Sequence, residues 1–323
     1  MKAAARAQHA TYHAEVPPTP DLAHDAAPAR CSLISRGHGE IMAGTAQRAS
    51  RWLLVEHPGP WARQALSSPP LDGPVGSRLA QTAAAYDAQV VLVRRPGDHR
   101  PPGVRRWFVV DHPSGTAVGG EWTEVDDLGA AAEALASGPE HPDARPLGRA
   151  DLILICTHGK RDVCCAQLAR PVVTDLAARW PDRVWETSHL GGHRFAPTAL
   201  MLPECVQYGR LDPAVAAGVV ERHLAGEVDP AYLRGMTYLA PPAQAALAAV
   251  VRHTGPGFVG TELTVTDGAD GWSVAVTGGV DGAERTHQVV VRTEPGAPAI
   301  QSCSAEVAEA PAQYVALVAQ SGA

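Results

Sequence analysis

The chain has 323 residues, of which 45% are hydrophobic and 19% charged, and its formal net charge is −7 with neutral histidines. At roughly 150 residues per domain, this length suits about two globular domains. The acidic balance and the lack of a basic stripe argue against a nucleic-acid binder. No apolar stretch approaches the ~18 residues of a membrane span, so we expect a soluble protein.

Residues 1–30 are rich in Ala, Pro and His and contain Glu15, Asp21 and Asp25. They lack the apolar core of a signal peptide. We therefore predict a disordered leader at 1–30 that carries no targeting signal, with ordered structure from about Cys31. The default expectation for such a chain is a cytoplasmic location.

The first segment, 31–148, alternates strand and helix signals. Apolar and β-branched runs predict strands, and Pro, Ser and Asp mark where helices begin. The expected strands are 52–56, 90–93, 107–110 and 117–122, with helices from about Trp61, from Ser77 and from Asp126 or Asp127. This alternation predicts an α/β layer arrangement.

The second segment, 149–228, repeats that pattern. We expect a buried strand at 152–155, a helix at 163–179 capped by Asp162, a strand at 184–187, a hairpin at 198–202 and 206–208, and a helix from Asp212 to about 225. Pro197 should form a turn before the hairpin, and its peptide bond is a candidate for the cis form. The two segments could be a diverged duplication.

The last segment, 229–323, predicts a helix at 241–253 and then strands near 261–267, 272–277 and 286–292. Five glycines between these strands supply the turns. We expect a small β-rich appendage.

Cysteines and histidines gather in the second segment. Cys156, Cys164, Cys165 and Cys205 lie within about 50 residues, whereas Cys31 and Cys303 lie far outside. In a reducing compartment such a cluster more often forms a metal or redox site than structural disulfides. Cys156 ends a predicted strand and Cys165 begins a helix, while His189 and His193 follow the next strand. Sites in open α/β sheets form outside the carboxyl ends of strands, so both pairs are placed to converge.

The ligand types leave zinc and an iron–sulfur cluster open. Structural zinc commonly uses C-x2–4-C knuckles, and the C-x8-C spacing of Cys156 and Cys165 is long for one but suits a cluster with two irons. A Rieske centre also combines two Cys with two His, but its ligands alternate along the chain. Here both cysteines come first. The glycines between the histidines allow a loop to wrap closely around a bulky inorganic core.

Three motifs resemble the sucrase/ferredoxin-like family, a branch of the thioredoxin-like [2Fe–2S] ferredoxins. They are Cys156-Thr-His-Gly-Lys-Arg-Asp-x-x-Cys165, His189-Leu-Gly-Gly-His193-Arg-Phe-Ala-Pro, and Gly44-Thr45-Ala46 followed by Arg51-Trp52-Leu-Leu-Val-Glu-His-Pro-Gly-Pro-Trp61. The likeness covers about 31–225. It implies a thioredoxin-like ferredoxin domain at 149–228 and one-electron transfer with an unidentified redox partner protein. It also implies a [2Fe–2S] cluster with Cys156 and Cys165 on one iron and His189 and His193 on the other.

Five further residues flank these ligands, namely His158, Lys160, Arg161, Cys164 and Arg194. His158 is expected to hydrogen-bond within its loop. The three basic residues could donate to cluster sulfides or offset negative charge on reduction. Cys164 is expected to be a bystander thiol.

Two other functions remain open on the residues alone. A thiol–disulfide redox protein of thioredoxin type could use Cys164, Cys165 or Cys205, although the usual C-x-x-C motif is absent. A zinc-stabilised binding module could use the same ligands. No placed pair of carboxylates supports a sucrase, so we expect an electron-transfer protein rather than an enzyme with its own substrate.

Overall fold

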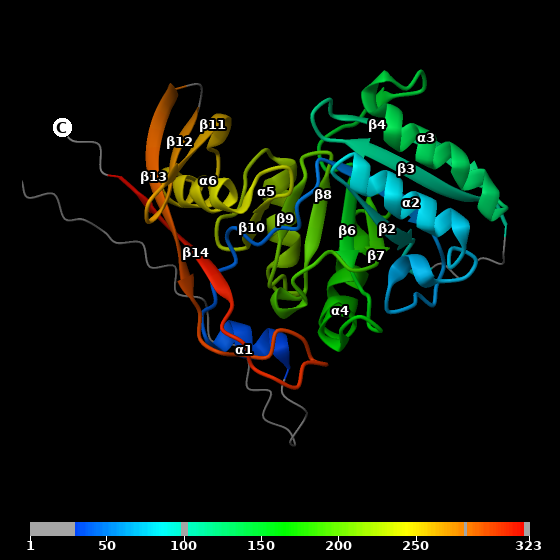
Figure 1. The fold of residues 1–323 in the computed structure, drawn as a ribbon, viewed down its shortest axis with the longest axis horizontal. Helices are drawn as coiled ribbons and strands as arrows, with labels where there is room; N and C mark the ends of the chain where they lie inside the picture. The colour runs from blue at the N-terminus through cyan, green and yellow to red at the C-terminus, as the bar shows by residue number, and fades with distance from the viewer. Residues whose placement is uncertain (1–29, 98–102, 281–282, 320–323) are drawn as a thin grey trace, which may run out of the picture.

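The computed structural model describes residues 30–97, 103–280 and 283–319 (Figure 1). They form one ten-stranded mixed sheet with helices packed on it and a separate four-stranded antiparallel sheet, which confirms a mixed α/β protein with a small β-rich appendage. Apart from Arg30, the predicted leader lies outside the described residues. The described chain begins with helix α1 (Cys31–Gly37), which the sequence pattern did not predict.

The first half of the large sheet contains β1 (Arg51–Glu56), α2 (Pro74–Ala85), β2 (Ala88–Arg94), β3 (Arg105–Asp111), β4 (Thr116–Trp122), α3 (Gly129–Ser137) and the short β5 (Arg145–Pro146). Strands β1 and β2 are parallel, and β3 pairs antiparallel with β1 and then with β4. Leu53 and Val55 face α2 and α3 in one apolar cluster.

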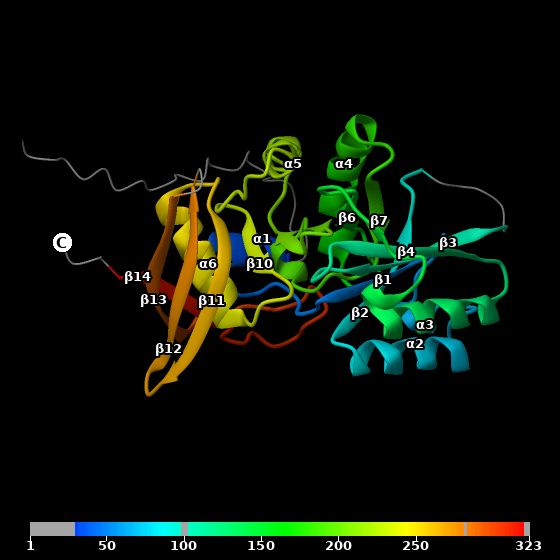
Figure 2. The same ribbon diagram turned by 90° about the horizontal axis from the view of Figure 1, so that it is seen from above.

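The second half contains β6 (Leu152–Cys156), α4 (Val163–Arg179), β7 (Val184–Thr187), β8 (Ala199–Leu202), β9 (Val206–Tyr208) and α5 (Ala216–Leu224). Its pairings repeat those of the first half: β6 and β7 are parallel, and β8 pairs antiparallel with β6 and β9. The halves meet where β2 pairs antiparallel with β7, Val93 opposite Thr187. Figure 2 shows α2 and α3 on one face of the sheet and α4 and α5 on the other.

The repeated connectivity is what a duplicated segment would give, and both halves belong to one continuous sheet with the order β10-β9-β8-β6-β7-β2-β1-β3-β4-β5. The division of the chain at residues 148 and 228 stays a prediction. Strand β10 (Leu233–Met236), which was not predicted, lies at the edge of the sheet beside β9.

The C-terminal region places α6 (Pro241–Thr254) against a sheet of β11 (Val259–Gly268), β12 (Gly271–Val280), β13 (Ala283–Pro295) and β14 (Ala312–Val318). Val274, Val276, Val289 and Val291 alternate along β12 and β13 and are fully buried beneath the helix. The predicted helix and three strands are confirmed, and β14 adds a fourth strand.

Two helix starts differ from prediction, and one predicted helix is wrong. In place of a helix from Trp61 there is a short 3-10 helix at Ala65–Ser67, because the following Pro69 and Pro70 lack the N–H that helix continuation needs. Helix α2 begins at Pro74 rather than at Ser77, since proline suits the first helical position. Helix α5 begins at Ala216, because Asp212 caps a separate turn by accepting a hydrogen bond from Ala214 N.

The parallel strands β6 and β7 bring the site together. Cys156 pairs with Thr187 at the carboxyl ends of these strands, so the segments that follow leave the same edge of the sheet. The peptide bond between Ala196 and Pro197, a candidate for the cis form, is cis, and β8 begins shortly after it, as predicted. Among the helices described here, none has the length and apolar character needed to cross a membrane.

Candidate metal centre

Cys156 and Cys165 stand at two ends of one tight connection. Cys156 is the last residue of the apolar strand β6, and Cys165 lies in the first turn of α4. Asp162 caps this helix, as predicted, by accepting a hydrogen bond from Cys164 N at 2.9 Å. Each cysteine is 1% exposed. The strand end and the helix start thus place both sulfurs beneath the same loop.

His189 and His193 lie on the loop that follows β7. Ser188 anchors its start, since its Oγ accepts a hydrogen bond from Leu92 N at 3.0 Å. Gly191 and Gly192 both adopt left-handed backbone conformations, with φ of 75° and 64°, which turn the chain back toward the cysteines. The two imidazole rings end 5.1 Å apart between centroids, tilted by 31°.

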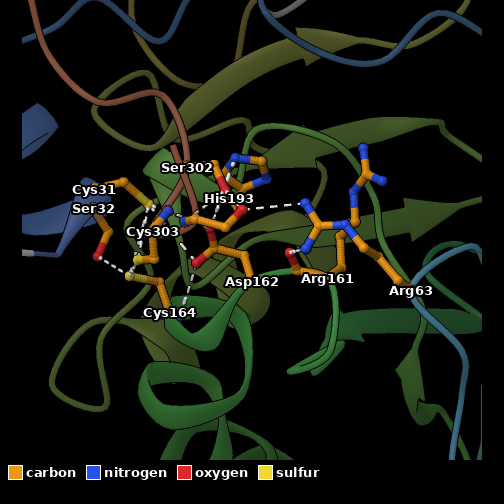
Figure 3. Close-up of polar contacts among 10 residues, drawn as sticks. Cys31, Ser32, Arg63, Arg161, Asp162, Cys164, His193, Ser302 and Cys303 are labelled. Atoms are coloured by element: carbon orange, nitrogen blue, oxygen red, sulfur yellow. Dashed lines mark hydrogen bonds and ion pairs between the residues drawn. The ribbon is translucent and has the colours of Figure 1, made fainter. Parts of the chain in front are cut away.

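Three of the four predicted ligands lie close enough together in the structure to bind a single metal ion. Ligating atoms of Cys156, Cys165 and His189 lie within 4.8 Å of one another. His193 lies beside this group and faces Asp162, with 3.8 Å between Nε2 and Oδ2 (Figure 3). Two ligand pairs on different irons of one cluster need not be as close as ligands of a single ion.

Unsatisfied ring nitrogens provide a test of whether a metal group fits here. Nδ1 of His189 and Nδ1 of His193 are both buried and lack any hydrogen-bond partner among the described residues. Leaving a buried polar atom unpaired costs about 1–3 kcal/mol. The opposite nitrogen of His193 faces Asp162, with 3.8 Å between Nε2 and Oδ2. This division is typical of a metal-binding imidazole, whose second nitrogen is held by a carboxylate or a carbonyl.

The thiol pair is electrostatically asymmetric. The hydrogen bond between the two side chains lowers the pKa of Cys156 well below its ordinary value and raises the pKa of Cys165. A further hydrogen bond with His189 also favours the Cys156 thiolate. Burial lowers the pKa of His193 below 6.5, so its ring is neutral at neutral pH. A thiolate and a neutral imidazole are the forms that bind metal ions.

Arg234, a residue that sequence reasoning missed, lies under the histidine loop from β10. It is 1% exposed. Its guanidinium donates to Gly191 O at 2.9 Å, to Thr45 Oγ1 at 3.1 Å and to Thr45 O. Burial lowers its pKa to about 9, and the nearby sulfurs of Cys156 and Cys165 partly oppose this shift. Arg234 therefore fixes the loop and places a buried positive charge near the thiol pair.

The other candidates divide between packing and surface positions. His158 is buried, burial lowers its pKa, and its Nε2 pairs at 2.8 Å with Ala62 O, which lies in a loop of the first half rather than in its own loop. Lys160 is exposed. The Arg161 carbonyl accepts a hydrogen bond from Arg63 at 3.4 Å. Arg194 forms an ion pair with Glu40 at 2.6 Å. Cys164 points away from Cys156 and contacts Cys31 and Cys303.

Comparison with known proteins places the chain in a family. Residues 42–235 match the sucrase/ferredoxin-like family. The chain is also similar to the Altered inheritance of mitochondria protein 32 of Debaryomyces hansenii, at 35% identity over 86 residues. That match covers 24% of this chain and 32% of the yeast protein, so it spans about a third of the relative's length. No solved structure matches the chain. Since the family match extends over more than half of its residues, the chain belongs to the sucrase/ferredoxin-like family.

Proposed function

We propose that this protein holds a [2Fe–2S] cluster through Cys156, Cys165, His189 and His193 and works as a one-electron carrier. The observation that supports this most is the buried pair of unpartnered Nδ1 atoms on His189 and His193, beside two buried cysteine sulfurs. Two thiolates and two imidazoles form an established ligand set for a two-iron cluster. The repeated βαβ unit followed by a hairpin and a helix supports a thioredoxin-like scaffold for it.

A bound cluster would supply one reversible electron transfer. The protein's own residues would set its position and its charge. The Cys156 and Cys165 thiolates would hold one iron, and the imidazole rings of His189 and His193 the other. The Asp162 carboxylate, 3.8 Å from Nε2 of His193, would favour a proton on that nitrogen and leave Nδ1 for the iron. Arg234 contributes a positive charge that favours an added electron.

This arrangement also supports coupling of the electron to a proton. Added negative charge raises the pKa of a neighbouring imidazole, whereas a thiolate ligand has no comparable proton to exchange. As ligands without the negative charge of a thiolate, His189 and His193 would make their side of a bound cluster the more favourable place for an added electron. The electron donor and acceptor would be partner proteins. The cytoplasmic location stays a prediction, since the name of the yeast relative links that protein to mitochondria.

A second candidate function is thiol–disulfide exchange. It is favoured by the 3.1 Å contact between the sulfurs of Cys164 and Cys303. In this case the protein would contain no inorganic sulfide, and oxidation would join these two residues.

Anaerobic purification followed by iron and acid-labile sulfide analysis distinguishes the two functions. The cluster predicts about two irons and two sulfides per chain and a reddish-brown colour. A colourless protein without sulfide would contradict the proposal. Reversible loss of two thiols on oxidation of that colourless protein would favour thiol–disulfide exchange.

A further inference from the structure

Three cysteines that are distant in sequence meet at a second place, next to the candidate metal centre. The Cys31 sulfur lies 3.8 Å from that of Cys164 and 3.5 Å from that of Cys303, and the last two sulfurs are 3.1 Å apart. Figure 3 shows them converging from α1, from the start of α4 and from the C-terminal loop. Asp162 completes the group, because a ligating atom from each of the four residues lies within 4.8 Å of the others.

Apolar packing accounts for buried thiols, and the cap of α4 accounts for Oδ1 of Asp162, but neither explains why the Cys31 sulfur lies 3.7 Å from Oδ2. The Asp162 side chain is fully buried. It is held by donors on two sides: Oδ1 accepts from Cys164 N at 2.9 Å, and Oδ2 accepts from Cys303 N at 2.8 Å and from Ser302 Oγ at 3.0 Å. These bonds fix the orientation of the carboxylate and leave acceptor capacity on Oδ1, which takes one of them.

We propose that Cys31, Cys164, Cys303 and Asp162 form a separate binding site for a single Zn²⁺ ion. Three thiolates and one carboxylate supply the four ligands of a closed, structural zinc site. The oxygen ligand favours Zn²⁺ over Cu⁺, which prefers sulfur alone. Binding displaces the thiol protons to solvent, and no electron is transferred. Because Cys303 is partly exposed, the ion has a route from solvent.

The geometry is close to what zinc requires. With Zn–S bonds of about 2.3 Å, a tetrahedral site separates its sulfurs by about 3.8 Å. Cys31 and Cys164 are already at 3.8 Å, and the other two separations would have to widen by less than about 1 Å. Ser32 Oγ donates to the Cys164 sulfur at 3.1 Å, which is the kind of outer hydrogen bond that supports a thiolate ligand. The positive end of the α4 dipole offsets part of the ligand charge.

The zinc would fasten helix α1 and the loop between β13 and β14 to the candidate metal centre. Cys31 and Cys303 lie outside the matched stretch 42–235, whereas Asp162 and Cys164 lie within it. Asp162 also faces His193 Nε2 at 3.8 Å. The ion would therefore hold α1 and the C-terminal loop over the helix that carries Cys165, and it would fix the carboxylate that orients His193.

The test measures zinc and iron together in the full chain, purified under reducing and anaerobic conditions. We expect about one zinc per chain in the unaltered protein. Cys31→Ser and Cys303→Ser should each lower zinc occupancy at least about tenfold while iron and the visible spectrum remain. Cys205→Ser is the matched control, because Cys205 is a buried free cysteine outside both groups, and it should retain both metals.

Replacement of zinc by Co²⁺ in the unaltered chain provides a measurement that does not depend on any variant folding. Tetrahedral thiolate ligation should give intense sulfur-to-cobalt charge-transfer absorption at one equivalent. Three results would each overturn the proposal. The first is a purified protein that contains no zinc and has a disulfide among these cysteines, and the second is the absence of a cobalt–thiolate band. The third is zinc that is lost in Cys156→Ser but kept in Cys31→Ser. Zinc and iron are measured separately. Zinc without iron would therefore contradict the proposed cluster and support the zinc site, and iron without zinc would do the reverse.

Discussion

The two glycines between the histidines provide a matched pair of perturbations. Gly191 and Gly192 both have left-handed backbones, so replacing either with alanine costs about 1–2 kcal/mol in backbone energy. Their surroundings differ. A Cβ on Gly191 would lie 3.0 Å from Gln47 Oε1, at the end of a side chain that can move slightly. A Cβ on Gly192 would overlap Nη2 of Arg234 and lie 2.7 Å from its Cζ.

The Arg234 side chain has little freedom to move away from a new Cβ, because it is buried and hydrogen-bonded to Thr45 and Gly191. The overlap adds an overpacking cost of about 1–3 kcal/mol. We therefore expect Gly192→Ala to lower the free energy of unfolding by about 2–5 kcal/mol, and Gly191→Ala by about 1–2 kcal/mol. Displacing Arg234 also releases the Gly191 carbonyl, so Gly192→Ala should lose iron faster on exposure to air.

Equilibrium urea unfolding, followed by tryptophan fluorescence of both variants under the same anaerobic conditions, measures these free energies. Iron retained per chain is measured in parallel over time in air. Equal destabilisation by the two substitutions, or a larger effect of Gly191→Ala, would refute the argument that Arg234 supports the loop through close contact at Gly192.

Three further predictions concern the ligands. Cys156→Ser and Cys165→Ser should abolish the visible absorption, whereas Cys164→Ser should keep it. If Cys164→Ser loses the absorption while Cys165→Ser keeps it, the ligand is Cys164 and the assignment is wrong. The reduction potential should fall by about 59 mV per pH unit in protein-film voltammetry, because added charge raises the pKa of the ring N–H of a ligating histidine, so a ring that has lost this proton in the oxidised state regains it on reduction. That slope should flatten below the oxidised-state pKa and above the reduced-state pKa, and a potential independent of pH from about 5 to 10 would contradict it. His189→Cys or His193→Cys should lower the potential in a redox titration, since an anionic ligand disfavours an added electron, and an unchanged potential would count against these ligands.

Local rules predicted the part of the site that depends on neighbours in sequence. The apolar run ending at Cys156 had to be a buried strand, and Asp162 had the side chain and spacing of a helix cap. The parallel pairing of β6 with β7 then placed the histidine loop beside the cysteines. Each step needed only residues within about one βαβ unit.

What could not be predicted depends on contacts between distant parts of the chain. Cys31 and Cys303 are 272 residues apart, yet their sulfurs lie at 3.5 Å, and no periodicity in either segment indicates that they meet. Arg234 stands in a four-residue edge strand whose sequence, Leu-Arg-Gly-Met, lacks an alternating pattern. Its role appears only once the histidine loop is folded over it. Cys164 was expected to be a bystander thiol, and its contacts with Cys31 and Cys303 depend on distant segments that meet only in the folded chain.

The [2Fe–2S] assignment is tested most directly by pulsed electron paramagnetic resonance of the reduced protein. A cluster held by Cys156, Cys165, His189 and His193 predicts a signal from one unpaired electron with strong coupling to two histidine nitrogens. Each substitution, His189→Cys or His193→Cys, should remove one of these couplings. A reduced protein with no such signal, or a cluster signal without nitrogen coupling, would contradict the ligand set.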